Sequence, residues 1–306
     1  MILSCGEALI DMLPRQTAAG EAVFLPCGGG AAFNTAIALG RLGVPVGLLA
    51  GLSSDMFGDV LRREMAASGA GFDLSISSDR PTTLAFVKLV DGAAEYGFID
   101  ENTAGRMISA AELPNIPAPV HALLFGGISL VAEPCGATFE SLMAQQSGRC
   151  VIMIDPNIRP GFIDNESTYR ARLNRMIGMA DIVKLSDEDL RWLYGAGDID
   201  RLAADILALG PHVVFLSKGA EGACAYTDDL KLHAHAEPAT LVDTVGAGDT
   251  FNGGLLAALY QAGALTKTGI QHLDQGTIVA ALELGTRTAA ISVSRAGANP
   301  PWSYEL

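Results

Sequence analysis

The sequence predicts an α/β protein whose central sheet is mostly parallel and is covered by helices on both faces. Short apolar runs with few charges alternate with longer segments of helical spacing along the 306 residues, which is the pattern of strands buried on both faces. Many of the 35 glycines stand in short clusters between these runs, where tight turns join strands to helices. Such alternation is typical of parallel strands connected through helices.

The expected strands of the central sheet are six apolar runs, at 1–5, 46–50, 122–125, 150–154, 182–184 and 213–217. The expected helices are eight segments of helical spacing, at 34–42, 59–68, 135–146, 169–179, 187–194, 199–209, 250–262 and 275–293. This length suits one large domain, so we expect residues 1–306 to form a single domain.

Two regions break the alternation and predict a small antiparallel sheet. Residues 21–27 have the composition of an exposed strand, and residues 82–100 that of a hairpin around Asp91-Gly92. Asp-Gly between two alternating segments is a strong hairpin signal. From the residues alone, the hairpin fits an added sheet and the edge of the main sheet equally well.

Composition restricts the class of protein. A formal net charge of −14 argues against a general nucleic-acid binder, since little basic charge remains to neutralise phosphates. The five cysteines are scattered and form no C-x-x-C pair, which indicates free thiols in a reducing compartment. We find neither a signal peptide nor an apolar stretch that could span a membrane. We therefore expect a soluble cytoplasmic protein.

Residues 243–254 carry the most informative motif, Asp-Thr-Val-Gly-Ala-Gly-Asp-Thr-Phe-Asn-Gly-Gly, directly before a predicted helix. Gly246, Ala247 and Gly248 are small enough for their backbone N–H groups to converge on one point. At a helix N-terminus, unsatisfied donors and the helix dipole both favour negative charge. The motif therefore predicts an anion-binding cradle made of backbone.

Asp249 is unusual in such a cradle, because a carboxylate there repels an anionic ligand unless it has a task. One task is to accept a proton from a hydroxyl whose oxygen attacks phosphorus. The alternative is a helix N-cap, a position that aspartate often occupies. The chain has no G-x-x-x-x-G-K-[ST] motif, so this would be phosphoryl transfer without a P-loop.

A second glycine run, Cys-Gly-Gly-Gly-Ala-Ala-Phe-Asn-Thr at 27–35, leads into another predicted helix. The amide of Asn34 can donate to and accept from hydroxyl groups, and Asp11 could accept hydrogen bonds from neighbouring hydroxyls of a polyol. An ordinary helix-start loop and a solvated turn aspartate explain the same residues.

Together, these two segments resemble the two signatures of the ribokinase-like (pfkB-type) carbohydrate kinases, and within that family the bacterial fructokinases. The resemblance extends over residues 2–302 and includes the stretches 5–13, 155–161, 184–189 and 294–302. It implies a three-layer α/β/α ribokinase-like fold in one kinase domain, residues 1–306, with a β-sheet lid from strands within about 12–27 and 82–101. This favours the lid over the edge hairpin.

The activity that the resemblance implies is ATP-dependent phosphorylation of a primary sugar hydroxyl, with D-fructose converted to fructose 6-phosphate. Asp249 would be the general base, and the backbone of Gly246, Ala247 and Gly248 would hold the transferring group. Alternatives are a kinase of the same family for 2-keto-3-deoxygluconate or a nucleoside, and a non-catalytic nucleotide- or sugar-binding regulator.

The resemblance also implies binding residues. The sugar would be held by Asp11, Gly28, Gly29, Asn34, Phe98 and Arg159, with Arg106 as a second cation for a sugar acid. ATP would be held by Lys184, Ser217, Gly219, Gly222 and Gly248.

Metal ions and a second copy of the chain complete this expectation. Mg²⁺ would accompany ATP, with Asp243 and Asp189 as candidate metal ligands and a monovalent cation such as K⁺ near Asp243 and Gly297. Which carboxylate among Asp187, Glu188 and Asp189 organises Mg²⁺ stays open, because acids also favour a helix N-terminus for structural reasons. The lid strands could join those of a second copy to form a homodimer.

Overall fold

A computed structural model describes residues 1–90 and 93–306, and for 87–90 and 93–96 it describes the backbone alone. The main sheet has six parallel strands, β1 (Ile2–Cys5), β4 (Val46–Leu49), β9 (Ala122–Gly126), β10 (Val151–Asp155), β11 (Ile182–Ser186) and β12 (Val213–Ser217). Two antiparallel strands, β13 (Ala223–Tyr226) and β14 (Lys231–Ala234), extend it. The spatial order is β14-β13-β12-β11-β10-β9-β1-β4.

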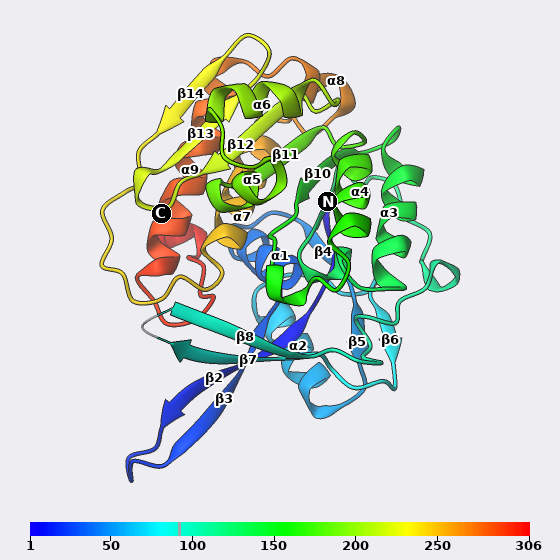
Figure 1. Cartoon of the computed structure of the whole chain (residues 1–306), viewed down its shortest axis with the longest axis vertical. Helices are drawn as coiled ribbons and strands as arrows, with labels where there is room; N and C mark the ends of the chain where they lie inside the picture. The colour runs from blue at the N-terminus through cyan, green and yellow to red at the C-terminus, as the bar shows by residue number, and fades with distance from the viewer. Residues whose placement is uncertain (91–92) are drawn as a thin grey trace.

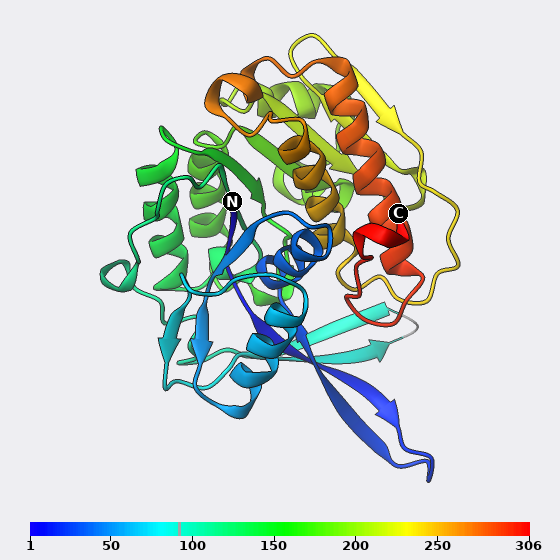
Figure 2. The same ribbon diagram turned by 180° about the vertical axis from the view of Figure 1, so that it is seen from behind.

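Helices cover both faces of this sheet (Figures 1 and 2). One layer consists of α3 (Cys135–Gln146), α4 (Glu166–Ile177), α5 (Asp187–Tyr194) and α6 (Ile199–Leu207). The other consists of α1 (Ala31–Arg41), α2 (Met56–Ala67), α7 (Ala247–Gln261), α8 (Lys267–Gln271) and α9 (Gln275–Val293). A separate apolar core lies between the sheet and each layer. The expected three-layer α/β/α architecture is confirmed.

The expected strands and helices are all present, but several helices begin earlier than predicted. The helices α1, α2, α4 and α7 each begin three residues before their predicted starts. In α4 and α7 the first three residues are small or polar, so the apolar stripe begins one turn inside the helix. The short strands β5 (Gly51–Ser53) and β6 (Ile76–Ser78), the strands β13 and β14, and α8 were not predicted. In the part of the chain that the structure describes, we find no helix long and apolar enough to cross a membrane.

A second, four-stranded sheet stands apart from the main one, with the order β3-β2-β7-β8. Its strands are β2 (Leu9–Gln16), β3 (Ala22–Gly29), β7 (Leu84–Val90) and β8 (Ala93–Ile99). The β2–β3 hairpin projects from the body of the molecule (Figure 1). The prediction of an added small sheet is therefore confirmed, and an edge hairpin on the main sheet is wrong. The predicted turn Asp91-Gly92 lies outside the described residues.

Short 3-10 helices follow several strands of the main sheet at their carboxyl ends. They include η2 (Ile128–Leu130) after β9, η3 (Pro160–Phe162) after β10 and η4 (Gly219–Glu221) after β12. Two others, η1 (Ala110–Glu112) and η5 (Ser303–Glu305), lie elsewhere in the chain. In open parallel sheets, ligands bind in the crevice outside the carboxyl ends of the strands. We therefore expect a ligand site at the carboxyl ends of the parallel strands, on the side of the main sheet that faces the small sheet.

Candidate active site

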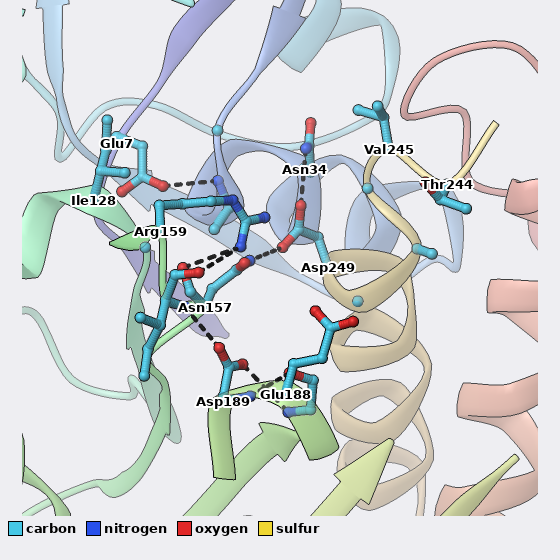
Figure 3. Close-up of a pocket in the computed structure, with 18 of the residues that line it drawn as sticks. Glu7, Asn34, Ile128, Asn157, Arg159, Glu188, Asp189, Thr244, Val245 and Asp249 are labelled. Atoms are coloured by element: carbon cyan, nitrogen blue, oxygen red, sulfur yellow. Dashed lines mark hydrogen bonds between the residues drawn. The ribbon is translucent and has the colours of Figure 1, made fainter. Parts of the chain in front are cut away.

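A cavity of about 740 Å³ lies at this edge, between the small sheet, the loops after the parallel strands and the N-terminus of α7 (Figure 3). Its size suits a small-molecule site. It brings together most of the residues singled out in the sequence: Asp11, Asn34, Phe98, Arg159, Lys184, Asp189, Ser217, Gly246, Ala247, Gly248 and Asp249. These residues come from segments far apart in the chain, so their convergence supports a common role.

Asp249 is buried in the wall of the cavity, in the first turn of α7. One carboxylate oxygen accepts a hydrogen bond from the side-chain amide of Asn34 at 2.9 Å, and the other accepts one from that of Asn157 at 3.1 Å (Figure 3). The N-cap of α7 is Gly246, and its cap involves no side-chain hydrogen bond. Asp249 is therefore not the helix cap, and the alternative explanation of this residue is wrong.

The surroundings of Asp249 make it a proton acceptor near neutral pH. Burial raises the pKa of its carboxyl to about 6, although the hydrogen bond from Asn34 acts in the opposite direction. A general base works best when its pKa lies near the operating pH. The two amides also fix the orientation of the carboxylate, so one geometry is presented to the cavity.

The backbone at the start of α7 lies in the same wall. Gly246 has a left-handed conformation with φ of 73°, and a Cβ there would lie 2.5 Å from that of Ala298, so only glycine fits. The N–H of Ala247 donates to the carbonyl of Thr244 at 3.3 Å, which removes it from the predicted set of free donors. The N–H groups of Gly248 and Asp249 belong to the first turn and have no acceptor within the helix.

A buried cation lies against this turn. Lys184 Nζ donates to Asp155 Oδ2 at 2.9 Å, and Asn252 Nδ2 donates to the same oxygen at 2.7 Å. Burial acts to lower the pKa of Lys184, but pairing with Asp155 prevails and raises it. A Cβ at Gly248 would lie 3.1 Å from Lys184 Nζ, so the ammonium group sits close beneath the helix start. The arrangement places fixed positive charge next to backbone donors, which suits phosphate oxygens.

Asp11, on β2, is the second buried carboxylate of the cavity wall. Burial and the nearby charge of Asp249 raise its pKa to about 7. Gly28 and Gly29 do not line the cavity. A Cβ at Gly29 would lie 2.1 Å from Asp11 Oδ2, and one at Gly28 would lie 2.8 Å from the ring of Phe33. Both glycines thus make room for neighbouring side chains.

Arg159 and Phe98 complete the wall under the lid. Arg159 follows β10, and its guanidinium donates to the carbonyl of Ile158 at 3.1 Å. Its charge acts to lower the pKa values of both Asp11 and Asp249. Phe98, on β8, contacts the ring of Phe162 edge to face, with centroids 5.0 Å apart. A charged group and an apolar ring therefore face the same space.

Some predicted residues lie elsewhere. Arg106 lines a second cavity, where it lies 3.7 Å from Asp100 in an ion pair. Gly219 and Gly222 belong to the η4 turn beyond Ser217 and do not line the main cavity. Both have positive φ, of 53° and 98°, which glycine adopts without steric cost, so they allow the chain to make this turn.

The acidic residues predicted to handle metal ions have structural partners. Asp189 accepts hydrogen bonds from the backbone N–H of Ile158 at 2.9 Å and of Ser186 at 3.3 Å. Asp243 accepts from the N–H groups of Val245 and Gly297, at 3.0 and 2.9 Å. Both carboxylates therefore hold loops together.

The neighbours of Asp189 have different surroundings. Asp187 pairs with Arg191 at 2.8 Å, whereas Glu188 lines the cavity. Within the described ranges, 1–90 and 93–306, we find no group of three or more metal-ligating side chains close enough to hold an ion.

Sequence reasoning missed several residues of the site. Glu7 lines the cavity, and Asn157 binds Asp249. Asp155 pairs with Lys184, and Asn252 donates to the same oxygen of Asp155. Asn157 stands 92 residues from Asp249, so no local pattern could reveal the contact. The only available signal was its position after a predicted strand, where functional side chains gather in parallel sheets.

Comparison with known proteins agrees with this geometry. A model of the pfkB family of carbohydrate kinases matches residues 1–304. The chain is 52% identical over 275 residues to a fructokinase of Rhizobium leguminosarum bv. trifolii, which covers 90% of this chain and 84% of that protein.

Solved structures are similar over nearly the whole chain. A fructokinase from Xylella fastidiosa with bound ATP is 29% identical, with a TM-score of 0.87 and coverage of 97% and 93% of the two chains. A fructokinase from Vibrio cholerae O395, with fructose, ADP and calcium ion bound, is 24% identical, with a TM-score of 0.86 and coverage of 97% and 94%. These likenesses confirm the expected ribokinase-like fold.

Proposed function

Because this chain belongs to the pfkB family of carbohydrate kinases, we propose that it transfers the γ-phosphoryl group of ATP to the primary hydroxyl of D-fructose. The products are fructose 6-phosphate and ADP. The fructokinase names of its relatives support this acceptor. The observation that carries the proposal is the buried carboxylate of Asp249, held by two amides beside the backbone donors of α7.

Asp249 acts as the general base. Its carboxylate accepts the proton of the sugar hydroxyl while that oxygen bonds to the γ-phosphorus and the bond to the β,γ-bridging oxygen of ATP breaks. The N–H groups of Gly248 and Asp249, with the ammonium group of Lys184, stabilise the charge of the transferring group. Closure of the small sheet over the sugar excludes water, which limits hydrolysis of ATP.

The sugar lies at the end of the cavity nearest the small sheet. Asp11 and Asn34 bind its hydroxyl groups, Phe98 covers its ring, and Arg159 reaches the sugar or the transferred phosphoryl group. Gly28 and Gly29 contribute by the space that they leave for neighbouring side chains.

ATP occupies the other end of the cavity, along the loops after β11 and β12. Lys184 and Ser217 line that end together with Gly248. Gly219 and Gly222 shape the η4 turn along which the phosphates lie.

Mg²⁺ enters with ATP, because it prefers substrate phosphates and one or two carboxylates over a cage made of protein side chains. Glu188 fits this role better than Asp189, whose two oxygens already accept backbone N–H groups. The ion would neutralise charge on the phosphates. Asp243 joins two loops near Gly297, and a monovalent cation such as K⁺ would bind beside it.

A sugar acid such as 2-keto-3-deoxygluconate is a less suitable acceptor. A second cation beside Arg159 would strengthen that assignment, but the candidate Arg106 pairs with Asp100 in another cavity. The main cavity is instead rich in carboxylates, including Glu7, Asp11 and Asp249, which oppose a second carboxylate on the substrate.

We also propose that two copies of the chain form a homodimer through the lid. The edge strand β3 carries Val23, Phe24 and Leu25, whose side chains are 40–49% exposed. An apolar edge strand is a template for pairing with another chain. A second copy of β3 would cover these residues. We place the enzyme in the cytoplasm, where ATP is available and reducing conditions keep thiols such as the five free cysteines reduced.

The decisive experiment is a comparison of kcat/KM for fructose, glucose, ribose and 2-keto-3-deoxygluconate with ATP. We expect fructose to have the highest value, and mass spectrometry or a coupled isomerase assay to identify fructose 6-phosphate. A higher kcat/KM for another acceptor would overturn the fructose assignment. Phosphorylation of none of the four would overturn the assignment of these acceptors altogether.

The dimer is tested separately by light scattering of Phe24→Asp. The matched control is Met56→Asp, which charges an exposed apolar residue on α2 instead. Only the first substitution should yield monomers.

A further inference from the structure

Glu7 is a buried carboxylate in the wall of the active-site cavity to which the mechanism above gives no role. It stands just after β1, where Gly6 turns the chain out of the main sheet. One oxygen accepts a hydrogen bond from the backbone N–H of Ala31 at 3.0 Å, and the other accepts one from that of Ser129 at 3.1 Å. One side chain therefore joins two loops that are 98 residues apart in sequence.

Two glycines show that these loops close tightly around Glu7. At Gly127, with φ of 74°, a Cβ would lie 1.9 Å from Glu7 Oε1, so the carboxylate occupies the space of a side chain at this position. At Gly30, with φ of 103°, a Cβ would lie 2.7 Å from the carbonyl oxygen of Glu7. That same carbonyl accepts a hydrogen bond from Phe33 at 3.3 Å.

The two joined loops form the sugar end of the cavity. The first loop leads into α1, which carries Asn34, and the second leads into η2, where Ile128 lines the cavity. In Figure 3, Glu7 and Ile128 lie together at the side of the pocket opposite Thr244 and Val245. Residues of β11, β12 and the α7 start line the other end, where ATP is proposed to bind.

We infer that Glu7 is a positioning residue for the acceptor sugar: its carboxylate holds the turn into α1 and the turn after β9 at the separation that the sugar requires. This inference rests on the proposed function, since it assigns the sugar to that end. A carboxylate serves the purpose because its two oxygens each accept from one backbone donor. An amide has one acceptor and turns its NH₂ group toward the remaining donor. Burial raises the pKa of Glu7, and the N–H groups of Ala31 and Ser129 oppose that shift.

The test uses Glu7→Gln and Glu7→Asp in the full-length protein. Gln keeps the size and loses one acceptor, whereas Asp keeps both acceptors but is one methylene too short to reach both loops. Steady-state kinetics are measured with the sugar that the wild type phosphorylates fastest. The test of Glu7 therefore remains valid even if that sugar is not fructose. We expect the KM for the sugar to rise about tenfold or more, the KM for ATP to change less than twofold, and kcat to fall less than threefold.

Asp181→Asn is the matched control. Asp181 is also buried and accepts a backbone hydrogen bond, from Ile152 at 2.7 Å. It directly precedes β11, however, so it lies at the amino ends of the parallel strands, away from the cavity. We expect this variant to lose thermal stability with unchanged KM values. Equal KM changes for sugar and ATP in the Glu7 variants, or a loss of stability with both KM values preserved, would mean that Glu7 has only a structural role and would overturn the inference.

Discussion

The two ends of the active-site cavity are built in different ways. The end proposed for the phosphates is centred on one continuous segment, 244–249, whose backbone turns into α7 beside Lys184 and Ser217. The sugar end is assembled from side chains and loops of β1, β2, β8, α1 and η2. A backbone cradle suits phosphate, an anion common to every turnover, whereas side chains can distinguish one sugar from another. We infer from this comparison that the backbone at the start of α7 determines the type of reaction, and that a different set of residues determines which sugar is accepted.

The largest effect is expected where the two ends meet, at Asp249. In Asp249→Asn the amide cannot take the hydroxyl proton, so kcat should fall about 10³-fold, within the usual contribution of general base catalysis. The Kd for ATP, measured by calorimetry, should stay within about twofold of the wild type, since the proposed phosphate ligands are Lys184 and the backbone of α7. Near-wild-type turnover in this variant would show that Asp249 is not the general base.

Lys184→Met tests the phosphate end. Removing one member of a buried ion pair leaves the other charge uncompensated, which typically costs about 3–5 kcal/mol. Among the described residues, Asp155 would then keep Asn252 as its one side-chain donor. We expect a loss of this size in urea unfolding, together with a higher KM for ATP. The control Lys231→Met breaks the exposed pair with Asp200 and should have a much smaller effect. Equal losses of unfolding free energy in the two variants would contradict the stabilising role assigned to the buried pair of Lys184 and Asp155.

The pH dependence of activity sharpens the assignment of the base. The pKa of Asp249 is raised to about 6, and only its ionised form accepts a proton. We therefore expect kcat to fall about tenfold for each pH unit below 6. The sign for stability is opposite: a raised carboxyl pKa means that the folded state binds the proton more tightly than the unfolded state, so this group stabilises the fold as pH falls.

Asp11 has a raised pKa of about 7 and faces the same cavity. Its contribution to the pH dependence of kcat must therefore be separated from that of Asp249. The profile of Asp11→Asn should retain the acid limb near pH 6. If the limb disappears, Asp11 rather than Asp249 controls the profile.

Phe98→Ala tests the sugar end and should have the smallest effect. Loss of the ring should raise the KM for the sugar about tenfold, a change of about 1.4 kcal/mol, and leave the KM for ATP unchanged. Phe86→Ala is a suitable control, because Phe86 lies in the same small sheet but contacts Phe24 instead of the cavity. A change in the KM for ATP in Phe98→Ala would show that the two ends are not separable.

The same division explains what could be predicted from the sequence. The strands and helices followed from apolar periodicity, and the backbone cradle at the start of α7 from one motif, because the residues of that cradle are neighbours in the chain. The sugar end depends on contacts across the fold. Asn157 and Glu7 act through partners that no local pattern reveals.

Two predictions failed for a related reason. The sequence placed Arg106 with Arg159, but the loop that carries Arg106 turns toward Asp100. It also counted the N–H of Ala247 as a donor to ligand, although Thr244 accepts it. Each error concerned a group whose partner is set by the path of a loop, which residue type alone does not determine.

The burial of Asp249 also bears on the second half of the catalytic cycle. With Asp249 as the proposed base, the proton rests after phosphoryl transfer on a buried carboxyl that also accepts hydrogen bonds from Asn34 and Asn157. The enzyme cannot begin another turnover until that proton leaves, and the cavity it would cross is then filled by product. We therefore expect proton release to wait for departure of the sugar phosphate, so that a pH indicator in a stopped-flow experiment would report product dissociation rather than chemistry.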